Sequence, residues 1–330
     1  MKLARWLAAK LVTGLVMIWI VASAMFFLLR WMPGNPAQTR YADLILHGAT
    51  PQAAAAQVAA MYGFMPKQPL PVEYGHYMWQ LLHLNLGVSI SETGIPVSHI
   101  VFSAFPWTVV LCLSGIVASF LIGVTLGVMA ALRRATKAGD GITAFGALMN
   151  GIPVFVIASL LFYIFTTEWA IFPQGGTVSI LYTPGWNAGY IGSLITHAIL
   201  PVIAYTLAGL GAWVLTTKSS VISVLGDDFI LAAELRGIGP LTVARYIVRN
   251  AMLPLFTIFA LALGLMLGGS VFIEDVFNYP GLGQLILTSE TSADYPVLTG
   301  AFLLIIVAVI VANFLADLAY PLIDPRVRRS

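Results

Sequence analysis

The sequence predicts an all-α, polytopic membrane protein with about six transmembrane helices. Three observations predict this class: the balance of apolar and charged residues, six apolar runs of membrane length, and an uneven distribution of lysine and arginine between the connecting segments. Of the 330 residues, 59% are hydrophobic and 9% are charged, and the mean hydropathy is +0.91. Soluble domains carry about 25% charged residues, so this composition is typical of a chain that lies in a bilayer.

The six apolar runs are long enough to cross a membrane, because a transmembrane helix needs about 20 mostly apolar residues. The first run follows Lys2, Arg5 and Lys10, as the apolar part of a signal peptide would, but it is too long and lacks a small-residue cleavage site. We therefore expect it to be a retained anchor. The expected spans are 7–29, 107–132, 143–165, 192–215, 255–272 and 297–319.

Lysine and arginine gather in alternate connecting segments. If the N-terminus is inside, the outer segments hold only Arg30, Arg40 and Lys67 of the 16 basic residues. Segments on the cytoplasmic side of a membrane carry the excess of these residues. This rule predicts that both termini are cytoplasmic.

Composition also limits the partners of the chain. The net charge of +2 gives no reason to expect a nucleic acid. Cys112 is the single cysteine, so no disulfide forms within the chain, and we expect its side chain to be a small buried hydrophobe. A thiol-ligated metal site is equally unexpected.

Along the chain we expect an N-terminal anchor helix (1–31), an extracytoplasmic segment with amphipathic helices (32–106) and a five-helix core (107–330). In the extracytoplasmic segment, Thr50 is expected to be the N-cap of a helix that begins at Pro51. His76 and His83 are seven residues apart and could share a helix face, but without a carboxylate pattern we expect exposed or interfacial histidines rather than a metal site. Residues 274–296 are turn-rich and apolar, as in a buried re-entrant element.

Several kinds of chemistry are absent from the sequence. There is no phosphate-binding G-x-x-x-x-G-K-[ST] loop and no H-E-x-x-H motif, and the two G-x-G triplets lack a third glycine. The chain is therefore not expected to be an enzyme by itself. Spans two to four contain no Asp, Glu, Lys or Arg, which weakens the two competing hypotheses, a stand-alone secondary carrier or channel and a membrane-embedded enzyme.

A charged segment, 217–254, connects the fourth and fifth spans on the cytoplasmic side. Asp227 and Asp228 suit a helix start, because carboxylates complement the helix dipole there. Gly237 is expected to end this helix and Pro240 to begin the next. The predicted result is a helix–turn–helix elbow that projects from the membrane and is shaped to fit a partner.

The sequence of this elbow, "AAELRGIGPLTVARYIVRNAMLPL", resembles the E-A-A loop of ABC importer permeases. The hallmark of that loop is a helix with small residues, a glycine and a downstream Leu-Pro pair. Its resemblance is closest to the oligopeptide, dipeptide and nickel permease family, in which the loop is the coupling helix that docks into the ATP-hydrolysing subunit. Ala232, Ala233, Gly237, Leu253 and Pro254 match this hallmark, with Glu234 after rather than before the small residues. The residues expected to couple to the ATP-hydrolysing subunit are Ala232, Ala233, Glu234, Gly237, Arg245, Leu253 and Pro254.

Five further segments resemble the same family in the same order. They are "PGNP" (33–36), "LNLGVS" (84–89), "IEDVFNYPGLGQL" (273–285), "ADYPVLTG" (293–300) and "NFLADLAYPLIDPRVR" (313–328). Asn35 replaces the usual aspartate of the first, the second lacks its acid, and Ala293 replaces the usual arginine of the fourth. We expect candidate positions for the translocation path or an outer gate at Glu274, Pro280, Gly281 and Gly283.

The resemblance implies the transmembrane fold of a type I ABC importer, in which the chain forms half of the pathway for a small polar solute. It implies di- or oligopeptides as the solute, with oligosaccharides and nickel as alternatives. It also implies a second homologous permease, two ATP-binding subunits and an extracytoplasmic substrate-binding protein. ATP and magnesium would bind to the partners, no cofactor to this chain, and the location would be the cytoplasmic membrane of a bacterium or archaeon.

Overall fold

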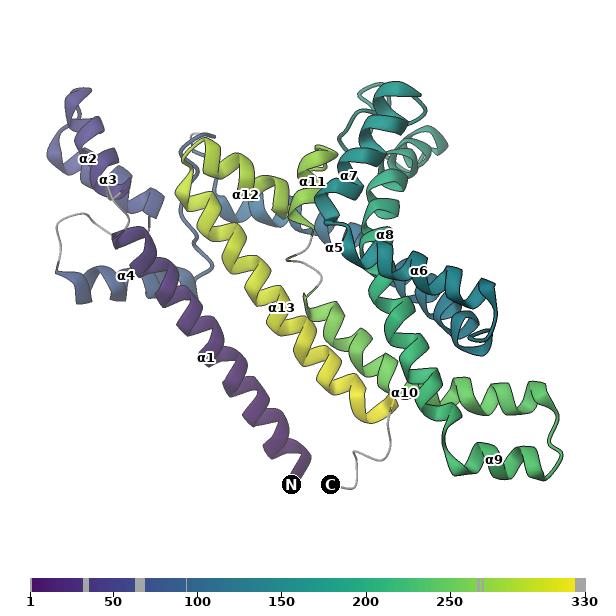
Figure 1. Cartoon of the computed structure of the whole chain (residues 1–330). Coiled ribbons are helices and arrows are strands. Elements are labelled where there is room, and N and C mark those ends of the chain that lie inside the picture. Colours follow the sequence, from purple (N-terminus) through teal and green to yellow (C-terminus); the bar gives the residue numbers. More distant parts are fainter. Residues whose placement is uncertain are drawn as a thin grey trace. The chain divides into compact units, whose positions relative to one another are not determined.

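The computed structural model describes residues 2–31, 36–62, 69–92, 94–265, 268 and 270–323, and in this part the regular structure is helical, apart from an isolated bridge between Val88 and Pro96. Among the described residues, five helices are long and apolar enough to cross a membrane, or six if one bent pair counts as a span. The predicted all-α, polytopic class is confirmed. The elements (Figure 1) are α1 Lys2–Trp31, α2 Pro36–Leu46, α3 Pro51–Tyr62, α4 Leu70–Leu82, α5 Val97–Leu132, α6 Lys137–Gly151, α7 Val154–Phe162, the π-helix η1 Tyr163–Glu168, α8 Ala188–Leu225, α9 Asp228–Leu235, α10 Pro240–Leu265, α11 Val271–Val276, α12 Leu282–Thr291 and α13 Tyr295–Ile323.

The chain divides into two compact units. The first consists of Met1–Thr108 and Pro280–Phe314, and the second of Val109–Tyr279 and Leu315–Ser330. The long helices α5 and α13 each begin in the first unit and end in the second.

The third span differs from the single helix expected at 143–165. It is broken into α6 and α7, which bend by 96° at the break. Pro153 causes the break, because the residue before a proline is disfavoured in helical geometry. Ile152 accordingly has extended backbone angles, with φ −84° and ψ 125°.

The fifth span also differs from the expectation of 255–272. The second helix of the elbow and the fifth span form one helix, α10, which runs from Pro240 to Leu265 with Pro254 inside it. Phe272 lies beyond this helix, in α11. The elbow is therefore joined to a membrane-spanning helix without an intervening loop.

Glycines let α5 and α8 pack closely in the second unit. A Cβ atom added at Gly127 would lie 2.5 Å from the Cβ of Thr217 and 2.7 Å from the carbonyl oxygen of Val214, both on α8. Small residues recur every fourth position along this face of α5, which is a typical way for helices to approach closely in a membrane. The small residues that meet α8 in this way are Gly115, Ser119, Gly123 and Gly127.

In the first unit, α1 packs against α4 and the core includes the fully buried Phe26. The predicted cap of α3 is confirmed, because the Thr50 hydroxyl accepts a hydrogen bond from the Ala53 amide at 3.3 Å. His76 is exposed on α4, whereas His83 follows the end of that helix. Within the described residues, no three His, Cys, Asp or Glu side chains form a group that could hold a metal ion.

Candidate functional site

The elbow consists of α9, a tight turn and the first part of α10, at the end of α8 (Figure 1). Asp227 occupies the N-cap position of α9 with an extended backbone, φ −78° and ψ 141°, and Asp228 lies in the first turn. The two carboxylates lie near the positive end of the helix dipole. The predicted start of this helix is therefore confirmed.

The turn between α9 and α10 is a Schellman motif centred on Gly237. The Ile238 amide donates to the Ala233 carbonyl at 3.1 Å, and the Gly237 amide donates to the Glu234 carbonyl at 2.9 Å. Gly237 has a φ of +70°, which disfavours residues with a Cβ. The predicted helix stop at Gly237 and restart at Pro240 are confirmed, and the reason for glycine is its left-handed backbone.

One side of the elbow holds it against the rest of the second unit. Ala233 and Ile230 of α9 are buried in a cluster with Val243 and Ile247 of α10. The same cluster includes Ala131 at the end of α5 and Val221 on α8, so the elbow rests directly on the ends of two spans. Motion of the elbow would therefore move those helices.

The other side of the elbow is uncovered. Leu231, Leu235 and Leu241 are 57%, 81% and 86% exposed. The exposed charged side chains of the elbow are Asp227, Asp228, Glu234, Arg236, Arg245 and Arg249. None of these six makes an ion pair or a side-chain hydrogen bond within the described residues. Exposed apolar residues rimmed by unpaired charges are typical of a protein–protein docking surface.

The structure separates the predicted coupling residues into three groups. Ala232, Glu234, Gly237 and Arg245 are exposed on the elbow, whereas Ala233 is buried beneath it. Leu253 and Pro254 lie farther along α10, about 20 Å from its start at 1.5 Å per residue. These two residues therefore belong to the span rather than to the exposed side of the elbow.

The candidate gate residues also occupy different environments. Glu274 is fully buried in the second unit, close to Cys112. Cys112 forms hydrogen bonds with Ser270 and Tyr205. The backbone carbonyl of Glu274 accepts a hydrogen bond from the Tyr279 amide at 2.7 Å. Glu274 thus belongs to a buried polar cluster, and Cys112 is buried as expected but hydrogen-bonded.

Pro280, Gly281 and Gly283 lie in the first unit, at the start of α12. Pro280 is exposed, whereas both glycines are buried. Gly281 has a φ of −96°, so this turn does not need a left-handed glycine. The Leu282 amide donates to the buried hydroxyl of Thr108 at 2.7 Å, which fixes the start of α12 against α5.

Sequence reasoning did not single out Asp294, which is 2% exposed and joins two of the motifs quoted for the resemblance. Its Oδ2 accepts hydrogen bonds from the Ser89 hydroxyl at 2.5 Å and from the amides of Ile90 and Ser91 at 3.1 and 3.0 Å. Its Oδ1 also accepts from the Val297 amide at 3.4 Å, as an N-cap of α13 does. The signal was the "ADYP" motif, in which a lone Asp precedes a membrane-length helix.

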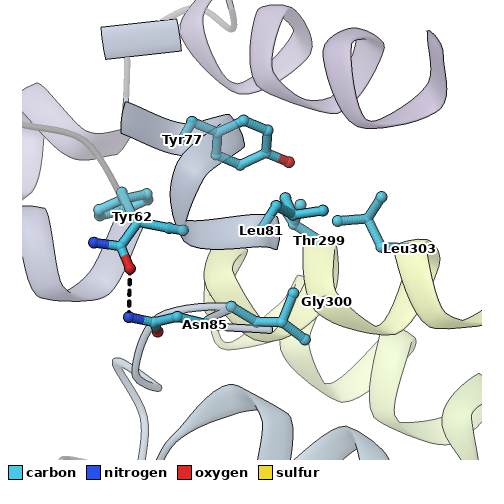
Figure 2. Close-up of a pocket in the computed structure, with 9 residues that line it drawn as sticks. Tyr62, Tyr77, Leu81, Asn85, Thr299, Gly300 and Leu303 are labelled. Atoms are coloured by element: carbon cyan, nitrogen blue, oxygen red, sulfur yellow. Dashed lines mark hydrogen bonds between the residues drawn. The ribbon is translucent and has the colours of Figure 1, made fainter. Parts of the chain in front are cut away.

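A small cavity of about 20 Å³ lies near this junction, in the first unit. Figure 2 shows Tyr62 and Tyr77 with Thr299 and Leu303 among the residues around it, and Asn85, which donates a hydrogen bond to Gln80 at 2.6 Å. Burial raises the pKa of Tyr62 and of Tyr77 well above the usual value, because the charged phenolate is disfavoured away from water. The cavity has room for about one water molecule, which needs roughly 10–15 Å³, and is too small for a solute.

The fold and the elbow define a class of protein: a multi-pass, α-helical membrane protein with an exposed elbow at the end of its spans. Residues 123–329 match the family described as the binding-protein-dependent transport system inner membrane component. The chain belongs to this family. It is therefore a non-catalytic permease subunit of an ABC importer in the inner membrane, and membership implies ATPase and binding-protein subunits as partners.

Similarity to individual relatives extends over nearly the whole chain. A Brucella ovis protein named as a peptide permease is 33% identical over 325 residues, which cover 98% of this chain and 99% of the relative. The dipeptide transport system permease protein DppB of Escherichia coli is 30% identical over 324 residues, covering 92% and 93% of the two chains. The oligopeptide transport system permease protein AppB of Bacillus subtilis is 31% identical over 304 residues, covering 92% of each.

Proposed function

We propose that this chain forms half of the membrane pathway of an ATP-driven importer of di- or oligopeptides. The observation that carries the proposal is the elbow: exposed leucines and unpaired charges at the tip, and a buried cluster that ties α9 to the ends of α5 and α8. Peptides are favoured as the solute because the relatives described above are named as peptide, dipeptide and oligopeptide permeases.

In this proposal two ATP-binding subunits, which bind ATP and magnesium, dock on the elbow of this chain and on that of a second, homologous permease. The coupling residues are Ala232, Ala233, Glu234, Gly237 and Arg245, with Leu253 and Pro254 transmitting motion along α10. Because the elbow and the fifth span form one helix, movement of the partners is passed to the membrane without a flexible loop. The elbow and both termini would face the cytoplasm.

At the opposite face, residues 32–106 would receive an extracytoplasmic binding protein. Glu274, Pro280, Gly281 and Gly283 are proposed to take part in an outer gate near the pathway. The turn that holds Pro280, Gly281 and Gly283 is fixed to α5 by the hydrogen bond between the Leu282 amide and Thr108, so a shift of α5 would move this turn.

The test is a mild-detergent purification of the chain from its native membrane, with its partners identified by mass spectrometry. We expect two nucleotide-binding chains and a second permease. Reconstituted with ATP in the lumen and the binding protein outside, the purified assembly should accumulate labelled di- or tripeptides. Uptake of nickel or an oligosaccharide instead would overturn the substrate, and recovery of the chain without an ATPase would overturn the coupling role.

A further inference from the structure

The helix α4 of the first unit lies against the membrane-spanning helix α1. The hydroxyl groups of Ser23 and Tyr74 form a hydrogen bond at 2.8 Å. The ring of Phe26 meets the rings of Tyr74 and Tyr77 at centroid distances of 5.5 and 5.4 Å. These contacts involve one turn of α1, because α4 crosses that helix rather than running alongside it (Figure 1).

The contacts with α1 fix the depth of α4 relative to the membrane. The apolar stretch of α1 that is able to cross a membrane is Ala8–Leu29. Ser23 lies about 9 Å before the end of this stretch, at 1.5 Å per residue. Amphipathic helices in the membrane interface are buried by about 5–10 Å, so Tyr74 bonds to α1 at the depth of such a helix. Bulk water is therefore not the expected neighbour of the open side of α4.

The residues of α4 divide into two opposite faces. Glu73 and Tyr77 are buried, and Tyr74 and Leu81 pack on the inner side with them. Glu73 is the only Asp, Glu, Lys or Arg of this helix, so the outer face carries no such residue. The exposed residues recur at intervals of three and four, which place them on one face, and they are Val72, Gly75, His76, Trp79 and Leu82.

The exposed face of α4 is largely apolar. Val72, Trp79 and Leu82 are 47%, 62% and 77% exposed. A row of such side chains in water would be unfavourable, because apolar surface is stabilised by removal from water. The neighbouring helix α3 differs, since its exposed residues include Gln52 and Gln57. Polar residues of this kind remain available to a soluble binding protein.

Aromatic residues gather where the apolar stretch of α1 ends. Trp31 lies just beyond Leu29 and is 74% exposed. Its ring stacks on Phe27 at 5.0 Å, and Phe27 stacks on Tyr74 of α4 at 6.0 Å. Trp79 adds an exposed indole whose N–H makes no hydrogen bond within the described residues. Tryptophan and tyrosine are enriched at the boundary between membrane and water, because the ring is apolar and its polar group reaches the headgroups.

We propose that α4 is an interfacial helix whose exposed face binds the lipids of one leaflet. Acyl chains would contact Val72 and Leu82, and an ester carbonyl or headgroup oxygen would accept the indole N–H of Trp79. The leaflet is the one at the Trp31 end of α1, which is the outer leaflet if the N-terminus is cytoplasmic. The inference holds whichever solute the transporter carries.

A second permease seated on α4 is the competing occupant, and the aromatic residues favour lipid. A contact between subunits does not require aromatic side chains to gather at the end of an apolar stretch, whereas the boundary of a bilayer selects them there. Lipid and a partner subunit both exclude water, so the test has to separate all three environments.

The test measures what surrounds single spin labels on the complete transporter in nanodiscs of phosphatidylcholine and phosphatidylglycerol. A nitroxide is attached to Val72→Cys or Trp79→Cys on α4, and to the matched control Gln57→Cys on α3, which is also exposed. Relaxation of the label by oxygen, which concentrates in lipid, is compared with relaxation by a water-soluble nickel chelate. Cys112 is the single native cysteine of this chain and is fully buried, and the unsubstituted transporter gives the background.

We expect oxygen to relax the two α4 labels about threefold more effectively than the nickel chelate does, and the reverse at Gln57→Cys. Strong relaxation of the α4 labels by the nickel chelate would show that water faces the helix. Weak relaxation by both reagents would show that another subunit covers it. Either result would overturn the inference, and the second α4 position serves if one variant does not assemble. Peptide uptake tests the proposed function separately, because a lipid-facing α4 neither requires nor excludes it.

Discussion

Replacing Gly237 with alanine should weaken the docking of the ATP-binding subunits. A Cβ built at this position meets nothing within 4 Å, so the cost comes from the backbone, whose φ is +70°. Left-handed geometry costs a non-glycine residue roughly 1–2 kcal/mol. If the free elbow relieves this strain by fraying, docking has to restore the left-handed turn at the same cost. The affinity for the ATP-binding subunits should then fall roughly 5- to 30-fold.

The assay is titration of the purified permease pair with its ATP-binding subunits, with uptake measured in parallel. Gly237→Asn is the matched control, because asparagine tolerates the left-handed region better than alanine although its side chain is larger. We expect the affinity to fall in the order Gly, Asn, Ala. An asparagine variant that binds more weakly than the alanine variant would point to a steric clash at the docking surface and would refute the argument from the backbone.

Three predictions concern stability, each measured as a change in thermal unfolding in mild detergent. Asp294→Ala should destabilise the chain by about 3–5 kcal/mol, because it removes the buried acceptor of several hydrogen bonds. Asp275 is exposed, so Asp275→Ala should have little effect. Equal effects of the two substitutions would contradict a structural role of the Asp294 hydrogen bonds. Gly127→Ala should cost about 1–3 kcal/mol, because the added methyl group overpacks the contact between α5 and α8. Gly141→Ala, in an open helical position, should stabilise by up to about 1 kcal/mol. A neutral Gly127→Ala would show that α5 and α8 can separate freely. Tyr77→Phe should not destabilise, because its buried hydroxyl has no hydrogen-bond partner in the described residues, and a loss above about 1 kcal/mol would reveal one.

Local signals in the sequence were sufficient for the elbow. Asp227 and Asp228 at a helix start, Gly237 at the stop and Pro240 at the restart act through the backbone of their own neighbourhood, so their effects could be predicted without knowing the fold. The same reasoning did not separate Ala232 from Ala233, although only the second is buried. Which of two adjacent alanines faces the ends of α5 and α8 depends on how the helices pack.

The third and fifth spans show where local patterns were misleading. Apolar length alone predicted one span at 143–165, but the chain bends there by 96° at a break that Pro153 causes. Conversely, Pro254 lies inside a continuous helix, α10. A proline in a membrane helix is tolerated where neighbouring groups satisfy the freed backbone, which the sequence does not reveal.

The sequence by itself determined the membrane class, the approximate number of spans, the elbow and the family resemblance, because these depend on composition, run length and short-range backbone chemistry. Only the tertiary structure decided that Ser89 bonds to Asp294, 205 residues away, and that Ala233 of the elbow is buried against the ends of α5 and α8. Helices that are apolar on all sides carry little periodic signal about which face is buried. Their faces are assigned only when the neighbours are in place.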